Sequence, residues 1–278
     1  MFHVEHSPAH LDQLETLILA KILSIANQKG GVGKTTTALN LAACLAYAEQ
    51  RVLLIDLDPQ GNTTSGIGSE RIAQGGAELL FRGGHIGSSV IRETRVPLLL
   101  LVPSSGALRE LDRALAAEGS RDGRLRSSLR SVADRFDFII IDCPPSLGTM
   151  PINALVASEG VIIPIQCEYY AMEGLAQILG AIDSVKHAAN PQLAVEGILL
   201  TMWDGSIQLT LDVESEVRSH FPDHVYQTVI PRDPALAEAP SHGLPIIDYE
   251  PRSKAASCYI RFTKEVLGHA RTEIGERP

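Results

Sequence analysis

A lysine- and glycine-rich segment, residues 29–36 (KGGVGKTT), constrains the possible folds of this chain more than any other feature of the sequence. It follows an apolar run, residues 21–26 (KILSIA), that has the length of a buried strand. It leads into residues 35–48, where apolar side chains recur every three or four positions, as in a helix. The segment meets the phosphate-binding pattern G-x-x-x-x-G-K-[ST] in a compressed form, because Gln28 occupies the usual first-glycine position. A strand, this loop and a helix together predict a P-loop.

The chemistry of such a loop follows from its residue types. Glycines allow several backbone N–H groups to point at one anion, and the N-terminus of the following helix adds its positive end. Lys34 is then expected to reach the β- and γ-phosphates of a nucleotide, and the Thr35 hydroxyl is expected to bind Mg²⁺. The loop residues predicted to surround the nucleotide are Gly30, Gly31, Val32, Gly33, Lys34, Thr35 and Thr36.

Apolar runs of strand length alternate with helix-like stretches along the rest of the chain. That alternation is typical of a parallel sheet covered by helices on both faces. Right-handed crossovers then give a three-layer, doubly wound α/β fold with a mostly parallel sheet. The expected strands are residues 21–26, 51–57, 97–102, 136–142, 160–165, 195–201 and 225–230, and helices are expected at 35–48, 173–188 and 210–220.

The series is not interrupted by an internal repeat or a long linker, so we expect residues 20–278 to form a single P-loop NTPase domain. Residues 1–19 look like an N-terminal extension, because Pro8 interrupts their start and leucines then follow at helical spacing. Two interpretations of the extension stay open: a short helix that covers an edge of the domain, or a docking segment for a partner.

The composition excludes several classes of protein. Lys and Arg number 24 and Asp and Glu 33, which gives a formal net charge of −9, so any grip on nucleic acid must come from a local basic patch. With 45% hydrophobic and 21% charged residues, the chain is globular and not disordered. No stretch approaches the roughly 18 apolar residues of a membrane span, and the acidic start lacks the pattern of a secretory signal. We therefore expect a cytoplasmic protein.

Aspartates follow two of the expected strands. Residues 56–62 (DLDPQGN) end the second strand, and residues 139–145 (IIIDCPP) place Asp142 after three buried isoleucines. Ligands of open α/β sheets bind at the carboxyl ends of strands, so Asp142 is expected to bind a Mg²⁺-coordinated water. Each aspartate alone could equally be structural, but their order and placement together favour a role at the nucleotide.

Four scattered cysteines, Cys44, Cys143, Cys167 and Cys258, argue against a disulfide framework or a zinc knuckle. Cys143 directly follows Asp142, but an iron cluster bridging a dimer would need two well-placed cysteines in each chain. We therefore expect Cys143 to be a free thiol that packs as a small core residue.

Lys29 sets this loop apart, because a P-loop already has its cation in Lys34. In this feature the segment resembles the deviant Walker A motif of the ParA/MinD ATPases, in which a signature lysine reaches across a dimer interface to the partner's nucleotide. The resemblance implies that Lys29 does the same. Two ATP molecules would then lie between the subunits of a homodimer, and each Lys29 would act as a catalytic cation in trans beside Lys34.

The resemblance also implies roles for the aspartates. Residues 56–62 are similar to switch I of ParA relatives, whose second aspartate is linked to hydrolysis. By this match Asp58 orients the attacking water, or holds it through the Mg²⁺ shell, and is catalytic, whereas Asp56 is structural. The implied metal site consists of Thr35, Asp58 and Asp142.

The likeness covers nearly all of residues 21–267 and is stronger to chromosomal ParA, also called Soj, than to MinD. In that group a Pro-Arg element closes over the adenine, which implies base contacts from Pro231, Arg232 and Asp233, although relatives usually have Asn at the last of these positions. Beyond the nucleotide motifs the likeness rests on residues 166–174 (QCEYYAMEG), 197–204 (GILLTMWD), 229–232 (VIPR), 238–243 (EAPSHG) and 248–253 (DYEPRS).

ParA relatives imply further partners. Their ATP dimers bind DNA without sequence preference, which would associate the protein with the nucleoid, and a ParB-type centromere-binding partner stimulates hydrolysis. Relatives commonly carry basic residues where this chain has Ser206, Ala235 and Leu244. The remaining candidates for DNA contacts, each of which could equally be a solvated surface charge, are Arg218, Arg232, Arg252, Lys254, Arg261 and Lys264.

The missing basic residues and the N-terminal extension leave a second function open: a ParA-like ATPase that positions another cargo, with weak or no DNA binding. The C-terminal segment, residues 259–278, mixes basic and acidic side chains. It therefore does not match the basic amphipathic membrane anchor of the MinD branch, and we expect no membrane role.

Overall fold

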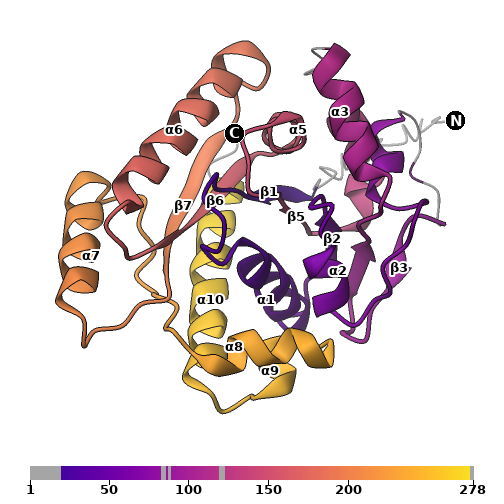
Figure 1. The fold of residues 1–278 in the computed structure, drawn as a ribbon. Coiled ribbons are helices and arrows are strands. Elements are labelled where there is room, and N and C mark those ends of the chain that lie inside the picture. Colours follow the sequence, from indigo (N-terminus) through magenta and orange to yellow (C-terminus); the bar gives the residue numbers. More distant parts are fainter. Residues whose placement is uncertain (1–19, 83–85, 87–88, 119–122, 276–278) are drawn as a thin grey trace, which may run out of the picture.

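A single sheet of seven strands forms the centre of the computed structural model, which describes residues 20–82, 86, 89–118 and 123–275 (Figure 1). The strand order is β3-β4-β2-β5-β1-β6-β7, and all neighbouring pairs are parallel except the antiparallel pair of β3 and β4. This confirms the predicted doubly wound, mostly parallel sheet. The strands are β1 (Lys21–Ile25), β2 (Val52–Asp56), β3 (Arg92–Glu93), β4 (Leu99–Val102), β5 (Phe138–Asp142), β6 (Gly160–Gln166) and β7 (Ala194–Thr201).

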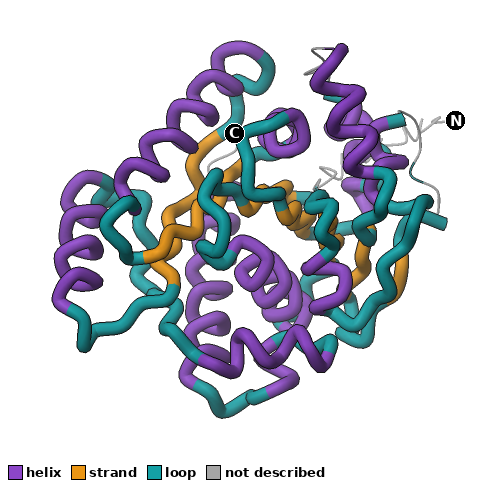
Figure 2. The backbone as a smooth tube through the Cα atoms, viewed as in Figure 1, coloured by secondary structure: helices purple, strands orange, loops and turns teal. Residues whose placement is uncertain are grey.

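Helices cover both faces of the sheet (Figures 1 and 2). Side chains alternate along the central strand β5: Phe138 and Ile140 pack in the core with α1 and α10, whereas Ile139 and Ile141 pack with α5 and α6. The first layer holds α1 (Lys34–Tyr47), α2 (Asn62–Gly66), α8 (Pro234–Glu238), η3 (Ala239–His242), α9 (Ile246–Tyr249) and α10 (Lys254–Gly275). The second holds η1 (Ala77–Phe81), α3 (Leu108–Glu118), α4 (Arg124–Arg130), η2 (Ala133–Arg135), α5 (Thr149–Ala157), α6 (Ala171–Ala188) and α7 (Gln208–His220).

Helix α1, which follows the P-loop, is largely buried. Its sequence is rich in alanine and leucine, which favour helix and carry little side-chain bulk, so it fits between the sheet and α10. Eleven of its residues are buried, including the polar Lys34, Thr37 and Asn40. The helix therefore holds the P-loop at its N-terminus in a fixed position against the sheet.

The carboxyl ends of β1, β2 and β5 meet at one edge of the sheet. In the registers of these strands, Ile25 of β1 lies beside Asp142 of β5, and Asp56 of β2 lies beside Asp142 on the other side. The P-loop leaves β1 at this edge. The topology thus brings the loop and both aspartate segments together from three distant parts of the chain.

The strands and helices expected from the sequence lie within two residues of their predicted bounds, with one exception. The strand predicted at residues 225–230 is wrong: these residues run beside β7 but form only one isolated bridge with it, between Val225 and Ile198. The amides of Gln227 and Thr228 turn instead to the Glu265 carboxylate of α10, at 2.7 and 2.9 Å. A helix side chain takes the donors that a strand ladder would need. The predicted extension, residues 1–19, lies outside the described residues.

The four cysteines are free and buried. Burial raises the pKa of the Cys143 thiol far above its ordinary value, and the neighbouring Asp142 carboxylate adds to the effect. Cys143 thus packs as a small apolar side chain, as predicted. Within the described ranges, no helix is both long enough and apolar enough to cross a lipid bilayer.

Gly197 of β7 provides a test of the packing. A Cβ atom built on Gly197 would lie 2.6 Å from Tyr226 Cζ, and this ring is already packed edge-on against Phe262, with 4.8 Å between the ring centroids. We expect Gly197→Ala to lower the free energy of unfolding by about 2–3 kcal/mol through overpacking. The control Gly180→Ala, at a position on α6 with nothing within 4 Å, should be neutral or stabilising by up to about 1 kcal/mol. Urea unfolding measures both, and equal stabilities would contradict this packing.

Candidate nucleotide-binding site

The P-loop joins β1 to α1 through glycines in the left-handed region of backbone space. Gly31 has φ of 77° and Gly33 has φ of 87°, values that other residues rarely adopt. Gly33 is the N-cap of α1, and no side chain from the described part of the chain caps this helix. The loop therefore leaves its positive end open toward a bound anion.

Lys34 lies inside the loop, almost entirely buried. Its Nζ atom donates a hydrogen bond to the Lys29 carbonyl oxygen at 2.8 Å. Burial lowers the pKa of Lys34, and the nearby Asp142 and Asp58 carboxylates oppose this effect only in part. An anionic phosphate in the loop would favour the charged ammonium, so the side chain is suited to bind one.

Asp142 is fully buried at the end of β5. Its Oδ2 atom accepts hydrogen bonds from the hydroxyls of Thr35, at 2.9 Å, and Thr63, at 2.6 Å. Its Oδ1 atom is buried without a hydrogen-bond partner among the described residues. Burial raises the pKa of Asp142 to about 8, and the neighbouring Asp56 carboxylate adds to the rise. A buried carboxylate oxygen that lacks a donor, next to a threonine hydroxyl, fits a Mg²⁺ ion or its bound water.

In the described ranges, no group of three His, Cys, Asp or Glu side chains is arranged to hold a metal ion. Thr35 and Asp142 would therefore contribute only part of a Mg²⁺ shell, with phosphate oxygens and water completing it. This division of ligands is the usual one for Mg²⁺ bound together with a nucleotide. The predicted residues Thr35 and Asp142 do come together, and Asp58 lines a cavity together with Thr35.

The two aspartates that follow β2 have different surroundings. Asp56 is buried and accepts hydrogen bonds from the Thr64 amide at 2.8 Å, the Thr64 hydroxyl at 2.7 Å and the Asp58 amide at 3.1 Å. Burial raises the pKa of Asp56 to about 6 despite these bonds. Asp58 accepts from the Gln60 amide at 2.8 Å, and its backbone carbonyl accepts from the Ser104 hydroxyl at 2.6 Å. Asp56 thus anchors α2, whereas Asp58 is held at the cavity wall.

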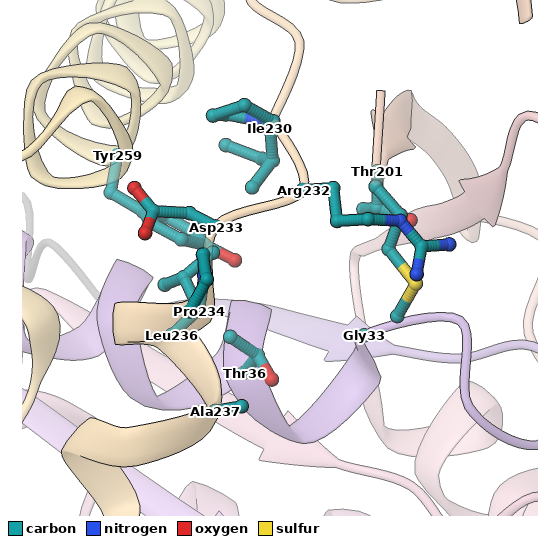
Figure 3. Close-up of a pocket in the computed structure, with 12 residues that line it drawn as sticks. Gly33, Thr36, Thr201, Ile230, Arg232, Asp233, Pro234, Leu236, Ala237 and Tyr259 are labelled. Atoms are coloured by element: carbon teal, nitrogen blue, oxygen red, sulfur yellow. The ribbon is translucent and has the colours of Figure 1, made fainter. Parts of the chain in front are cut away.

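Two adjoining cavities extend from this point. The first, of about 290 Å³, is lined by loop residues with Lys34, Thr35 and Asp58. The second, of about 420 Å³, is mainly apolar and lies between α1, the end of β7 and α8 (Figure 3). Gly33, Thr36 and Met202 line both. The sizes and linings suit the phosphate chain and the base of a nucleotide, respectively.

The base-contacting residues predicted from sequence lie at the second cavity. Pro231, Arg232 and Asp233 all line it. Figure 3 shows the Arg232 side chain extending toward Thr201, and the Asp233 carboxylate on the side of Tyr259. Asp233 is the N-cap of α8, and Pro234 is the first residue of this helix. The Asp233 Oδ1 atom accepts a hydrogen bond from the Ala235 amide at 3.0 Å. Asn and Asp cap helices about equally well, so Asp preserves the backbone here in place of the usual Asn.

Some lining residues escaped the sequence analysis. Tyr259 reaches the second cavity from α10, and Met202, with a left-handed φ of 50°, follows β7. Thr201 Oγ1 donates to the Val32 carbonyl at 2.9 Å and so ties the P-loop to β7. Only their position directly after a strand could have indicated Met202 and its neighbours from the sequence, because ligands bind at the carboxyl ends of parallel strands.

Lys29 lies at the rim of the site. Its amide donates to Asn27 Oδ1 at 3.0 Å, and its Nζ atom lies 3.0 Å from Glu168 Oε2, in the segment between β6 and α6. The Lys29 side chain is 34% exposed and that of Glu168 48%, so this ion pair faces solvent. The loop thus has one cation inside, Lys34, and a second one outside.

The basic candidates for DNA contacts divide into two groups. Arg218 is committed within the chain: it pairs with Glu214 at 2.9 Å and donates to the Tyr226 carbonyl at 3.1 Å. The others are exposed, and Arg232 lies beside the second cavity. Among the positions without the usual basic residue, Ala235 is buried, Leu244 is half-buried and Ser206 is exposed.

Three of the exposed cations share one face of α10. Lys254, Arg261 and Lys264 are spaced by seven and three residues, which places them on one side of a helix. Arg252 lies just before the helix, and Lys254 Nζ lies 6.0 Å from the centroid of the Trp203 ring. The structure therefore gathers a basic stripe that the sequence analysis named only as separate residues.

The raised pKa of Asp142 predicts how stability depends on pH. The folded, nucleotide-free protein keeps a proton on Asp142 up to about pH 8, whereas the unfolded chain releases it near the ordinary value of 3.8. The folded state therefore binds more protons in this interval, and the free energy of unfolding should fall as pH rises through it. We expect Asp142→Asn to flatten this slope and to raise the melting temperature at about pH 8.

Thermal unfolding without nucleotide, across a pH series, measures this effect. Asp212→Asn, at an exposed position of α7, is the control and should keep the slope of the unaltered protein. The same Asp142→Asn variant should lose the extra stabilisation that nucleotide with Mg²⁺ gives. An unchanged pH slope in this variant would show that Asp142 does not control it.

Comparison with known proteins agrees with this geometry. A family model described as an AAA domain matches residues 20–195. The chain is 50% identical over 253 residues to the sporulation initiation inhibitor protein Soj of Bacillus subtilis strain 168, covering 90% of this chain and 100% of the relative. It is 46% identical over 251 residues to the chromosome partitioning protein ParA of Myxococcus xanthus strain DK1622, covering 90% and 88% of the two chains.

A solved structure shares the fold over nearly the whole chain. Cobyrinic acid a,c-diamide synthase from Mycobacterium smegmatis, with a bound ATP analogue and magnesium, matches with a TM-score of 0.78 and 32% identity. The match covers 92% of this chain and 97% of that one. In sequence, however, Soj and ParA are considerably more similar, and they match over nearly the same length. The chain belongs to the Soj/ParA family of chromosome-partitioning ATPases.

Proposed function

We propose that this ATPase is a dimerisation switch for partitioning chromosomes or plasmids: ATP closes a homodimer and hydrolysis opens it. The observation that carries the proposal is the position of Lys29. Its ammonium lies outside the loop beside Glu168, while Lys34 already supplies the cation inside. A second cation at the rim is placed to reach the nucleotide of a facing subunit, where it would complete a site closed to water.

Residues of both cavities bind the nucleotide in this proposal. Lys34 and the loop amides hold the β- and γ-phosphates, and the second cavity, with Pro231 and Arg232, receives the base. Thr35 and Asp142 would hold Mg²⁺, which would supply positive charge at the phosphates. The orphaned Oδ1 atom of Asp142 supports this assignment, because ionisation of this buried carboxyl needs a cation or a donor.

Hydrolysis depends on Asp58 and on Lys29 of the facing subunit. Asp58 lines the phosphate cavity, and the hydrogen bonds from Gln60 and Ser104 fix its backbone and carboxylate. In this proposal its carboxylate orients the attacking water. The incoming ammonium stabilises charge that develops on the transferring phosphoryl group. Because both parts must be in place, basal turnover is slow, and a ParB-type partner acts by stabilising the competent arrangement.

The closed dimer binds DNA through phosphate contacts. The net charge of −9 means that these contacts come from a local patch, and the basic stripe of α10 is the best described candidate. The same helix contributes Tyr259 to the second cavity, so the nucleotide and the DNA would both contact α10. A dimer doubles the stripe and so strengthens binding only in the ATP state.

The substrate named for the diamide synthase is not part of this proposal. That protein is 32% identical to the chain, whereas Soj is 50% identical over a similar length. The two proteins share an ATP-binding fold, and fold alone does not transfer a substrate.

Three substitutions separate the steps of the switch. Lys34→Ala should abolish ATP binding. Lys29→Ala should bind ATP but remain a monomer, because it lacks the cation in trans. Asp58→Ala should form the ATP dimer and hydrolyse ATP at least about 100-fold more slowly. Nucleotide titration, light scattering after size exclusion and phosphate release measure the three steps. A Lys29→Ala protein that dimerises normally with ATP would overturn the proposed mechanism.

DNA binding is tested by removing the stripe. The triple variant of Lys254, Arg261 and Lys264 to Ala should weaken ATP-dependent DNA binding by at least about 10-fold at low salt and reduce its salt dependence. The matched control replaces three exposed cations of the opposite layer, Arg109, Arg113 and Lys186, and should retain binding. If the unaltered protein binds no DNA even at low salt, the alternative of a cargo-positioning ATPase is favoured.

A further inference from the structure

Two neighbouring tyrosines are the most exposed large apolar side chains among the described residues. Tyr169 is 77% exposed and Tyr170 63%, whereas the next, Leu98, is 50% exposed. Their ring centroids lie 5.1 Å apart in an edge-to-face arrangement. Two aromatic rings held together in water form an apolar patch, and tyrosine is a residue type that protein interfaces favour.

The patch is held in a defined position. Tyr170 is the N-cap residue of α6, and its carbonyl accepts from the Gly174 amide at 3.2 Å. The Ala171 amide donates to the Glu168 carbonyl at 2.9 Å, which closes the turn that carries both rings. Because the backbone is fixed, a partner would not have to order this turn on binding, which lowers the entropic cost of contact.

The tyrosines directly follow the ion-pair partner of Lys29. Glu168 contacts both Lys29, at 3.0 Å, and the side chain of Gln166 at the end of β6. The patch therefore lies beside the cation that the proposed function sends across the interface. The other cluster of exposed apolar side chains in the described residues, Ile207, Leu209 and Leu211, lies at the start of α7, away from the Lys29–Glu168 pair in sequence.

We propose that Tyr169 and Tyr170 form the apolar part of the interface with a second copy of this chain in the ATP state. This inference rests on the proposed function, in which Lys29 reaches the nucleotide of the facing subunit. A lysine side chain extends only about 6 Å from its Cα atom. The facing subunit must therefore approach the rim of the P-loop closely, and the turn of residues 168–170 lies on that rim.

The tyrosines add an apolar contribution to the charged contacts at the rim. When Lys29 turns to the partner's phosphates, it gives up Glu168, so one anionic partner replaces another. The exposed ion pair of Lys29 with Glu168 contributes little to stability, so its loss offsets only a small part of what the contact with the partner's phosphates contributes in a site closed to water. Burial of the four tyrosines of a symmetric dimer supplies a favourable free energy that is independent of this exchange.

The test compares the double variant Tyr169→Ala/Tyr170→Ala with the unaltered full-length protein. With a slowly hydrolysed ATP analogue and Mg²⁺, analytical ultracentrifugation should give a dissociation constant of the dimer that is at least about 10-fold higher for the double variant than for the unaltered protein. Nucleotide affinity, measured with a fluorescent ATP analogue at protein concentrations that keep both proteins monomeric, should agree within about twofold, since neither ring lines the cavities described above.

Two controls make the result specific. Leu98→Ala removes a comparably exposed apolar side chain just before β4 and should leave dimerisation unchanged. The double Tyr→Phe variant at 169 and 170 keeps the rings and should dimerise nearly normally. Equal dimerisation of the unaltered and Tyr→Ala proteins, or equal weakening by Leu98→Ala, overturns the interface and leaves the proposed function standing. If the unaltered protein stays monomeric with the analogue, both fail.

Discussion

Charged groups removed from water at the ends of β1, β2 and β5 are the constraint on which this site depends. Asp56 and Asp142 are fully buried on neighbouring strands, and burial raises the pKa of both carboxyls. Burial acts on Lys34 in the opposite direction and lowers its pKa. Neutral threonine hydroxyls satisfy part of this charge, but not all of it. The free protein therefore holds an electrostatically costly site, which a nucleotide with its cation would relieve, so that ligand binding and stability are linked.

Local pattern was sufficient for the architecture and for the interior of the site. The P-loop, Asp142 and the strands of the parallel sheet are each encoded within a few adjacent residues, by glycine spacing and apolar runs. Because parallel strands align their carboxyl ends, the sequence also placed these motifs at one edge. Long-range partners were not accessible in this way. The Lys29–Glu168 pair joins residues 139 positions apart, and no pattern near either residue indicates it.

The wrong strand and the unexpected cap have a common physical origin. Residues 225–230 have the composition of a strand, yet Glu265 of α10 binds two of their amides and prevents a ladder. Asp233 was expected at the base, and the structure uses its carboxylate to cap α8 as well as to line the cavity. In both cases a side-chain carboxylate accepts hydrogen bonds from backbone amides. Such bonding depends on tertiary packing, so propensity alone does not reveal it.

Trp203 is the only tryptophan of the chain, and its surroundings give it an additional use. It directly follows Met202 of both cavities, its indole N–H donates to Glu214 at 2.6 Å, and Lys254 of the basic stripe lies over its ring. A lone indole between the second cavity and the basic stripe makes the unaltered protein its own optical probe. A ligand that changes the surroundings of this ring, at the cavity or at the stripe, is expected to change its fluorescence without a dye, a label or any change of sequence.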